Sequence, residues 1–324
     1  MTSPTEDHTR PTQAEGLSTP GSTVEPVPTV VLRRSKSARL KGAQNDESIR
    51  YAFARMVRKP LPALSLMILT FMGIMVVFPD LFTQFKPGQQ DLSAVMQDPS
   101  PEHWLGTDAL GRDLWSRIVH GARYTLGLAL VANIIASVVG GLLGTFAGYI
   151  GGIVDNALMR ILDVFLSFPG IVLAIAFMAV AGSGTPSLVF GVVLYTFPLY
   201  ARVARAATLS VRSHDFLASA RLSGRRTLTI MFDHVVPNIS ATMTALAVVR
   251  MAECILTISA LSFLGIGLEP GVPEWGQMLS DGRQYMLSRP DAVLYPGLAI
   301  MLAVLAINVL GQYLTDIFDP YQKS

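Results

Sequence analysis

Two oppositely charged residues, Arg250 and Glu253, stand three positions apart inside a long apolar run. On a helix this spacing places both side chains on one face. A charge at the centre of a bilayer costs about 3 kcal/mol or more, so such groups are usually paired or face water. Two interpretations stay open: the pair lines a solute path, or it is a structural ion pair at a subunit interface. Asn308 in the last apolar run is a third candidate for a path.

Motifs for catalysis or metal binding are absent from the sequence. It contains no G-x-x-x-x-G-K-[ST] phosphate loop, no H-E-x-x-H and no G-x-S-x-G. The single cysteine, Cys254, lies in an apolar run and is predicted to be a packed side chain. We therefore predict no catalytic residue, no metal site and no enzyme activity for this chain. The histidines are scattered and do not show metal-ligand spacing: His8, His103, His120, His214 and His234.

The elements that must hold these residues are predicted to be membrane helices. The chain has 324 residues, of which 51% are hydrophobic and 15% charged, whereas a soluble domain has about 25% charged residues. A helix needs about 20 apolar residues to cross a bilayer. The fold class is therefore an all-α membrane protein with about six transmembrane helices. The predicted spans are 61–82, 124–149, 158–181, 186–206, 239–264 and 292–314.

The distribution of Lys and Arg predicts the orientation. Basic residues concentrate before the first span and between spans four and five, which places the N-terminus in the cytoplasm, and six spans return the C-terminus there. We expect a multi-pass protein of the inner cell membrane. Residues 1–48 are predicted to be a disordered cytoplasmic tail. The basic cluster near its end is interpreted as topogenic, with binding to membrane lipid as the alternative.

Glycines in the second span follow a strict four-residue spacing at Gly140, Gly144, Gly148 and Gly152. They lie on one helical face and predict close approach of a neighbouring helix. This pattern indicates a helix bundle and does not point to a particular solute.

The segment 209–238, between spans four and five, is predicted to form two short helices joined by a turn at Gly224. Glycine adopts a positive φ there at no steric cost. Pro237 is expected to open the fifth span, where its missing N–H does no harm. A compact protrusion of this kind suits docking into a groove of a cytoplasmic partner.

The same segment resembles the EAA loop of ABC-importer permeases. Gly224 and Pro237 stand at the spacing of that motif, and His234 and Val236 occupy its Ile and Leu positions. Of the three residues at the E-A-A positions, Ala218, Ser219 and Ala220, only the last matches. The resemblance implies that these residues couple the chain to an ATPase.

Further runs resemble the C-type permease of dipeptide and oligopeptide importers, in order from about residue 49 to 320. They include the segment 103–117, the motif Pro273-Glu-Trp-Gly276 and a C-terminal Asp319-Pro320. Residues 49–121 would form the first helix and an extracytoplasmic segment, and 122–320 the core permease domain. Ile258 and Gln312 depart from the family, which usually has acidic residues there.

This resemblance implies a type I ABC-importer permease bundle and a set of partners. These are a second, B-type permease, two ATP-binding subunits and an extracytoplasmic substrate-binding protein. ATP and Mg²⁺ would belong to the ATPase subunits, so no cofactor is expected in this chain, and no nucleic-acid partner. The expected cargo is a di- or oligopeptide. Alternatives are nickel chelates, glutathione or haem, and, from another class, an ion-coupled secondary transporter.

The predicted extracytoplasmic segment holds Trp104, Asp108, Arg112 and Asp113. One interpretation is a cap that meets the binding protein or closes an outer gate. The other, slightly favoured, is a folded loop that braces the bundle.

Overall fold

The computed structural model describes residues 59–214, 217 and 222–318. The predicted tail, 1–48, lies outside them. Within the described residues all regular structure is helical, apart from an isolated bridge between Thr107 and Asp113. The elements are α2 (Pro60–Val77), η1 (Pro79–Leu81), α3 (Leu114–Ile150), α4 (Gly152–Leu166), α5 (Gly170–Ala181), α6 (Thr185–Arg212), α8 (Thr227–Ile230), η2 (Met231–Val235), α9 (Val236–Phe263), α10 (Trp275–Gly282), η3 (Arg283–Tyr285) and α11 (Asp291–Phe318).

The number of predicted membrane helices is confirmed for the described part of the chain. Five helical stretches are long and apolar enough to cross a bilayer, and a bent pair of shorter helices makes a sixth if it counts as one span. The five are α2, α3, α6, the continuous stretch from α8 to α9, and α11. The first span ends at Val77, five residues before the predicted Phe82.

The third span was predicted as one helix, 158–181, and this prediction is wrong. The structure has two helices, α4 and α5, bent by 87° at the break between them. Pro169 at the N-cap of α5 disfavours helical geometry in the residue before it and cannot donate a backbone hydrogen bond. The apolar run therefore continues through an elbow, which we define as residues 165–171.

Helix α3 begins at Leu114, ten residues before the predicted start of the second span. The Asp113 side chain accepts a hydrogen bond from the Ser116 backbone N–H and caps the helix. The boundary predicted between residues 121 and 122 consequently falls inside α3, and the charged turn after Asp113 is helical. With 37 residues, α3 is about 55 Å long.

The glycine stripe packs α3 against α6. A side chain at Gly140 would overlap Phe197 and Tyr200, one at Gly144 would overlap the Ala201 backbone, and one at Gly148 would crowd Arg205 and Thr208. Gly152 does not take part, because α3 ends at Ile150 and Gly151 turns the chain with a φ of 73°.

Pro237 lies in the first turn of α9, as predicted, but the fifth span does not begin there. Helical backbone runs from Thr227 through the π-turn η2 into α9, and Pro237 lies at the second position of α9. A π-turn has an extra residue, which relieves the clash between a proline ring and the preceding turn. The expected turn at Gly224 is confirmed by its φ of 70°.

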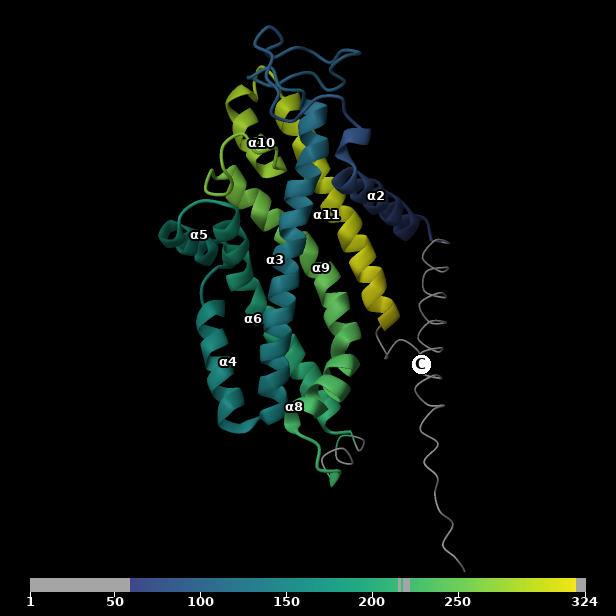
Figure 1. Cartoon of the computed structure of the whole chain (residues 1–324), viewed down its shortest axis with the longest axis vertical. Helices are drawn as coiled ribbons and strands as arrows, with labels where there is room; N and C mark the ends of the chain where they lie inside the picture. The colour runs from purple at the N-terminus through teal and green to yellow at the C-terminus, as the bar shows by residue number, and fades with distance from the viewer. Residues whose placement is uncertain (1–58, 215–216, 218–221, 319–324) are drawn as a thin grey trace, which may run out of the picture. The chain divides into compact units, whose positions relative to one another are not determined.

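The two ends of α3 meet different parts of the chain (Figure 1). Its N-terminal end lies beside α10 and the segment 78–113, which we call the cap segment. Its C-terminal end lies beside α8 and η2. A large apolar core joins α3, α6, α9 and α11, and a smaller one gathers around Tyr149 at the C-terminal end.

Candidate functional site

The predicted Arg250–Glu253 pair is formed on α9. Arg250 donates from Nη1 to Glu253 Oε2, and the two side chains retain 30% and 43% of their exposure. The Nε of Arg250 is buried and has no hydrogen-bond partner among the residues that the structure describes. The pair is therefore neither buried in the core nor fully exposed to solvent. This partial exposure suits a surface that another molecule covers.

Glu253 also lines a pocket of about 370 Å³ beside the elbow. Thr257 and Tyr195 are the other lining residues with polar side chains, and their hydroxyls are 2.7 Å apart. The elbow and Leu199 supply the apolar wall. Helices α4, α5, α6 and α9 thus bring together residues that lie far apart in the sequence.

The remaining membrane residues named from the sequence have separate positions. Asn308 is half-buried on α11, and no hydrogen bond or ion pair joins it to Arg250 or Glu253 in the described chain. Cys254 is buried, as predicted, with its Sγ 3.9 Å from Asn133 Oδ1. Ile258, the first departure from the family pattern, is fully buried in the apolar core, and Gln312 is exposed.

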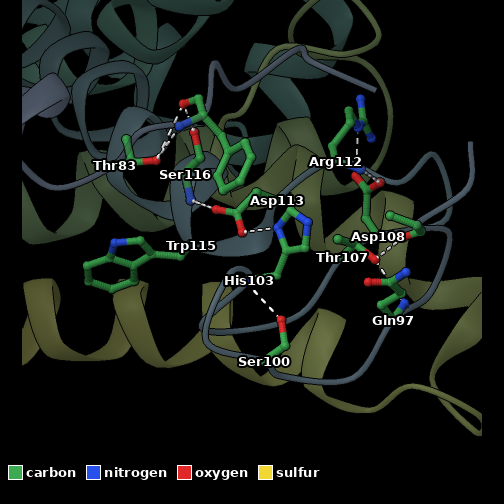
Figure 2. Close-up of polar contacts among 12 residues, drawn as sticks. Thr83, Gln97, Ser100, His103, Thr107, Asp108, Arg112, Asp113, Trp115 and Ser116 are labelled. Carbon is green, nitrogen blue, oxygen red and sulfur yellow. Dashed lines mark hydrogen bonds and ion pairs between the residues drawn. The ribbon is translucent and has the colours of Figure 1, made fainter. Parts of the chain in front are cut away.

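Asp113 organises the cap segment (Figure 2). Besides capping α3, its carboxylate lies 3.0 Å from His103 Nδ1, and both side chains are buried. Trp115 Nε1 and the Ser116 hydroxyl donate to the carbonyl oxygens of Phe82 and Phe85, each at 2.7 Å. These bonds fasten the cap segment to the first turn of α3.

Arg112 and Asp108 extend this network toward α10. Arg112 Nε donates to Asp108 Oδ2 over 2.6 Å, and its Nη2 lies 3.5 Å from Asp281 of α10. Arg117 of α3, only 1% exposed at its side chain, stands 3.6 Å from both of these carboxylates. The two buried guanidinium groups thus share the carboxylates of Asp108 and Asp281.

Three of the four residues named in this segment therefore brace the bundle. Trp104 differs: its ring centroid lies 5.9 Å from that of Trp115, yet it is 63% exposed. An aromatic ring that is both supported and exposed is suited to contact another molecule.

Glu274 is a buried residue that the charge pattern did not reveal. It caps α10 by accepting from Gln277 N at 2.8 Å, and it accepts from the Thr125 hydroxyl at 3.0 Å. It is fully buried between α3 and α9. The sequence signal for this role was the position of Glu274 directly before Trp275 in the motif Pro273-Glu-Trp-Gly276, since a Glu that precedes a helix can serve as its N-cap.

Apolar side chains are exposed at Leu222 and on the following α8 and η2, beside the C-terminal end of α3 (Figure 1). Leu222 is 90% exposed, and Leu228 and Phe232 are each more than half exposed. Leu217 is fully buried in the smaller core with Tyr149, Ile230 and Val235. An exposed apolar surface that is held in place by a buried residue, here Leu217, favours binding of a partner. Ala218, Ser219 and Ala220 lie outside the described residues.

His234 and Pro237 are placed by η2 and the start of α9. His234 is half-buried, and its carbonyl oxygen accepts from Asn238 Nδ2, while Pro237 is exposed. Gly224 is exposed, with open space where a side chain would go. Gly224 precedes α8, and Pro237 lies in the first turn of α9, so α8 and η2 separate the two positions of the motif.

Two ion pairs that were not predicted join α4 to α6, one near the start of α4 and one near its end. Arg205 binds both oxygens of Asp155 with hydrogen bonds of 2.5 and 2.6 Å, and Arg202 binds Asp163 at 2.5 Å. Arg212 donates to the carbonyl of Gly148 at 3.3 Å. These contacts make the C-terminal ends of α3 and α6 and the start of α4 one braced unit.

Comparison with known proteins agrees with this architecture. Residues 140–323 match the family model for the binding-protein-dependent transport system inner membrane component. A dipeptide transport system permease protein of Alkalihalophilus pseudofirmus is 38% identical, over 85% of this chain and 90% of its own. A glutathione transport system permease protein of Pectobacterium atrosepticum is 41% identical over 72% and 78%, and a nickel transport system permease protein of Escherichia coli is 33% identical over 80% and 93%.

The relatives are permease components rather than catalytic subunits, which fits the five long apolar helices and the bent pair. The resemblance drawn from the sequence motifs is thereby confirmed. The chain belongs to the family of binding-protein-dependent transport system inner membrane components, as a multi-pass permease of the ABC-importer type that is similar to permeases named for dipeptides, glutathione and nickel.

Proposed function

We propose that this chain forms one half of a translocation path and is driven through its segment 213–238 by separate ATP-binding subunits. The observation that carries the proposal is the contrast between Leu222, which is exposed, and Leu217, which is buried in the smaller core with Tyr149 of α3. The first offers an apolar surface for a partner, and the second transmits a displacement into α3, α6 and α9 through the smaller core. ATP and Mg²⁺ act in the partner subunits.

The proposed orientation places this end in the cytoplasm, together with both chain termini. The cap segment then faces the other side, where exposed Trp104 is available to a substrate-binding protein. A second permease of B type covers the face that carries Arg250 and Glu253, and the path runs between the two. Asn308 is assigned to the same path from its position on α11. The bundle would be of type I.

The proposed cargo is a di- or oligopeptide. A relative named as a dipeptide permease aligns with 85% of this chain, which supports the assignment. Similar permeases are named for glutathione and nickel, so these cargoes are the alternatives. ATP-dependent uptake of labelled dileucine that unlabelled glutathione does not inhibit would support peptide. Uptake of nickel or glutathione in its place would overturn the cargo while leaving the permease role intact.

The coupling role is tested by Gly224→Val, with Gly265→Val as the matched control. Both glycines have a positive φ, of 70° and 76°, and both have open space around a new side chain. The backbone strain of about 1 to 2 kcal/mol is therefore similar. Gly265 follows α9 and lies at the opposite end of the bundle.

We expect Gly224→Val to abolish ATP-driven uptake and release the ATP-binding subunits during purification, whereas Gly265→Val retains them. Uptake should stop on ATP depletion and survive collapse of the membrane potential, which separates this mechanism from an ion-coupled transporter. Full uptake and normal retention of the ATPase in Gly224→Val would contradict the coupling role.

A further inference from the structure

Three hydrogen bonds determine which side chains of the pocket beside the elbow donate and which can still accept. The Thr257 hydroxyl donates to the backbone carbonyl of Glu253 one turn earlier, at 2.9 Å. A hydroxyl has one hydrogen. The 2.7 Å contact between Tyr195 and Thr257 must therefore be donated by Tyr195, so the Tyr195 oxygen can only accept a further bond.

Glu253 adds a second acceptor to the same pocket. Its Oε2 is occupied by Arg250, whereas its Oε1 has no hydrogen-bond partner among the described residues. Glu253 lines the pocket, whereas its partner Arg250 does not. Two residues of the pocket lining, Glu253 and Tyr195, thus each have an oxygen with lone pairs available, Oε1 of the carboxylate and the phenol oxygen.

The elbow supplies the other half of the site. Phe165, Phe168 and Ile171 form an apolar wall on the side of the pocket contributed by α4 and α5. Gly170 has no side chain, and any Cβ there would lie 2.7 Å from the Tyr195 ring. The absence of that atom lets the ring pack on the elbow.

We propose that this pocket binds a protonated amino group attached to an apolar body, such as the amino-terminal end of a peptide with an apolar first residue. An ammonium group has three donors and no acceptor, which complements two acceptors. A metal ion fits less well, because the described chain holds no cluster of three His, Cys, Asp or Glu side chains. The proposal rests on the proposed path and names the part of the cargo that the path recognises.

A pair of photoreactive probes tests the proposal directly. Leucine amide with a diazirine in its side chain carries the ammonium group and an apolar body, and its N-acetyl derivative is the neutral twin. Each is irradiated with membrane vesicles that contain the full-length chain, and the labelled peptides are mapped by mass spectrometry. We expect the amine to label 165–171 or 195–199 about tenfold more than its neutral twin does, because the neutral probe lacks the charge-assisted bond.

Glu253→Gln should reduce labelling by the amine about tenfold, because the replaced carboxylate no longer offers a charged acceptor. Glu269→Gln, which removes an exposed carboxylate outside the pocket, is the control and should label as the wild type does. If Glu253→Gln fails to insert, Tyr195→Phe serves instead. It leaves the Arg250–Glu253 pair in place and should reduce labelling about threefold.

Equal labelling by both probes, stronger labelling by the neutral one, or unchanged labelling in both pocket variants would overturn the proposal. The labelling needs neither ATP nor transport. A failure of the ATP-coupling experiments would thus leave this result standing, and a failure here would leave the permease role standing.

Discussion

Thr125 on α3 donates a 3.0 Å hydrogen bond to the carboxylate of Glu274, although 149 residues separate them. The same hydroxyl accepts from the Trp275 backbone N–H at 3.1 Å, and the Trp275 ring N–H donates to the carbonyl of Ile118 at 2.9 Å. Through these bonds the short helix α10 is fixed against the N-terminal half of α3.

Removal of the Glu274 side chain should destabilise the protein. Glu274→Ala leaves Gln277 N–H and the Thr125 hydroxyl without their buried acceptor, at a cost of about 2 to 5 kcal/mol in the free energy of unfolding. Glu274→Gln keeps one oxygen but sets an amide donor in place of the other, and should cost about 1 to 2 kcal/mol. Thermal unfolding in detergent, followed by size-exclusion chromatography, measures both.

The control for this series is Glu269→Ala, an exposed position before α10 that should unfold at the wild-type temperature. If Glu274→Ala proves as stable as Glu269→Ala, the bond network around α10 contributes nothing to the fold.

The contact between α3 and α6 should reject even a methyl group at Gly144. An added Cβ would overlap the Ala201 backbone, which cannot rotate away. Gly144→Ala should therefore lower the free energy of unfolding by about 1 to 3 kcal/mol. Gly127→Ala, on the same helix with open space around it, should be neutral or stabilise the helix by up to about 1 kcal/mol. The yield and unfolding temperature should thus be clearly lower for Gly144→Ala than for Gly127→Ala. Identical values in the two variants would contradict the close packing.

Arg289 should protect the cap segment from local opening. Its guanidinium donates to the carbonyl oxygens of Met96 and Gln97, and Asp291 fixes it with a bond of 2.7 Å. The bond to Asp291 also raises the pKa of Arg289, so the side chain stays charged. Arg289→Ala should speed amide hydrogen exchange at Gln97 and Thr107 about tenfold or more, because two backbone carbonyls lose their donor.

Arg283→Ala removes an exposed arginine from the neighbouring η3 and should leave exchange at these amides unchanged. Equal exchange rates in the two variants would show that Arg289 does not hold the cap segment.

Hydropathy predicted the helical class and most of the spans, since these depend on composition averaged over about 20 residues. It did not reveal the elbow, because the residues on both sides of Pro169 are equally apolar. A hydropathy average does not report a change in the direction of the chain. It also placed the start of α3 too late. Arg117 and His120 read as a polar loop, whereas the structure buries Arg117 against Asp108 and Asp281, which lie 9 and 164 positions away.

The site shows the same limit. A spacing of three residues was sufficient to predict the Arg250–Glu253 pair, because both lie on one helix. Tyr195 and Thr257 come together over 62 residues of chain, and only the packing of α6 on α9 brings them to the same pocket. Gly224 was predictable from local backbone chemistry, while the burial of Leu217 depends on residues from α3, α6 and α9.

The length of α3 has a mechanical consequence. One uninterrupted helix carries the Asp113 cap at its first turn and Tyr149 of the smaller core at its last. A tilt of about 10° would move one tip of a 55 Å rod roughly 10 Å relative to the other. A displacement near Leu217 would then be transmitted to the N-terminal end of α3, because the helix has no break at which it could bend.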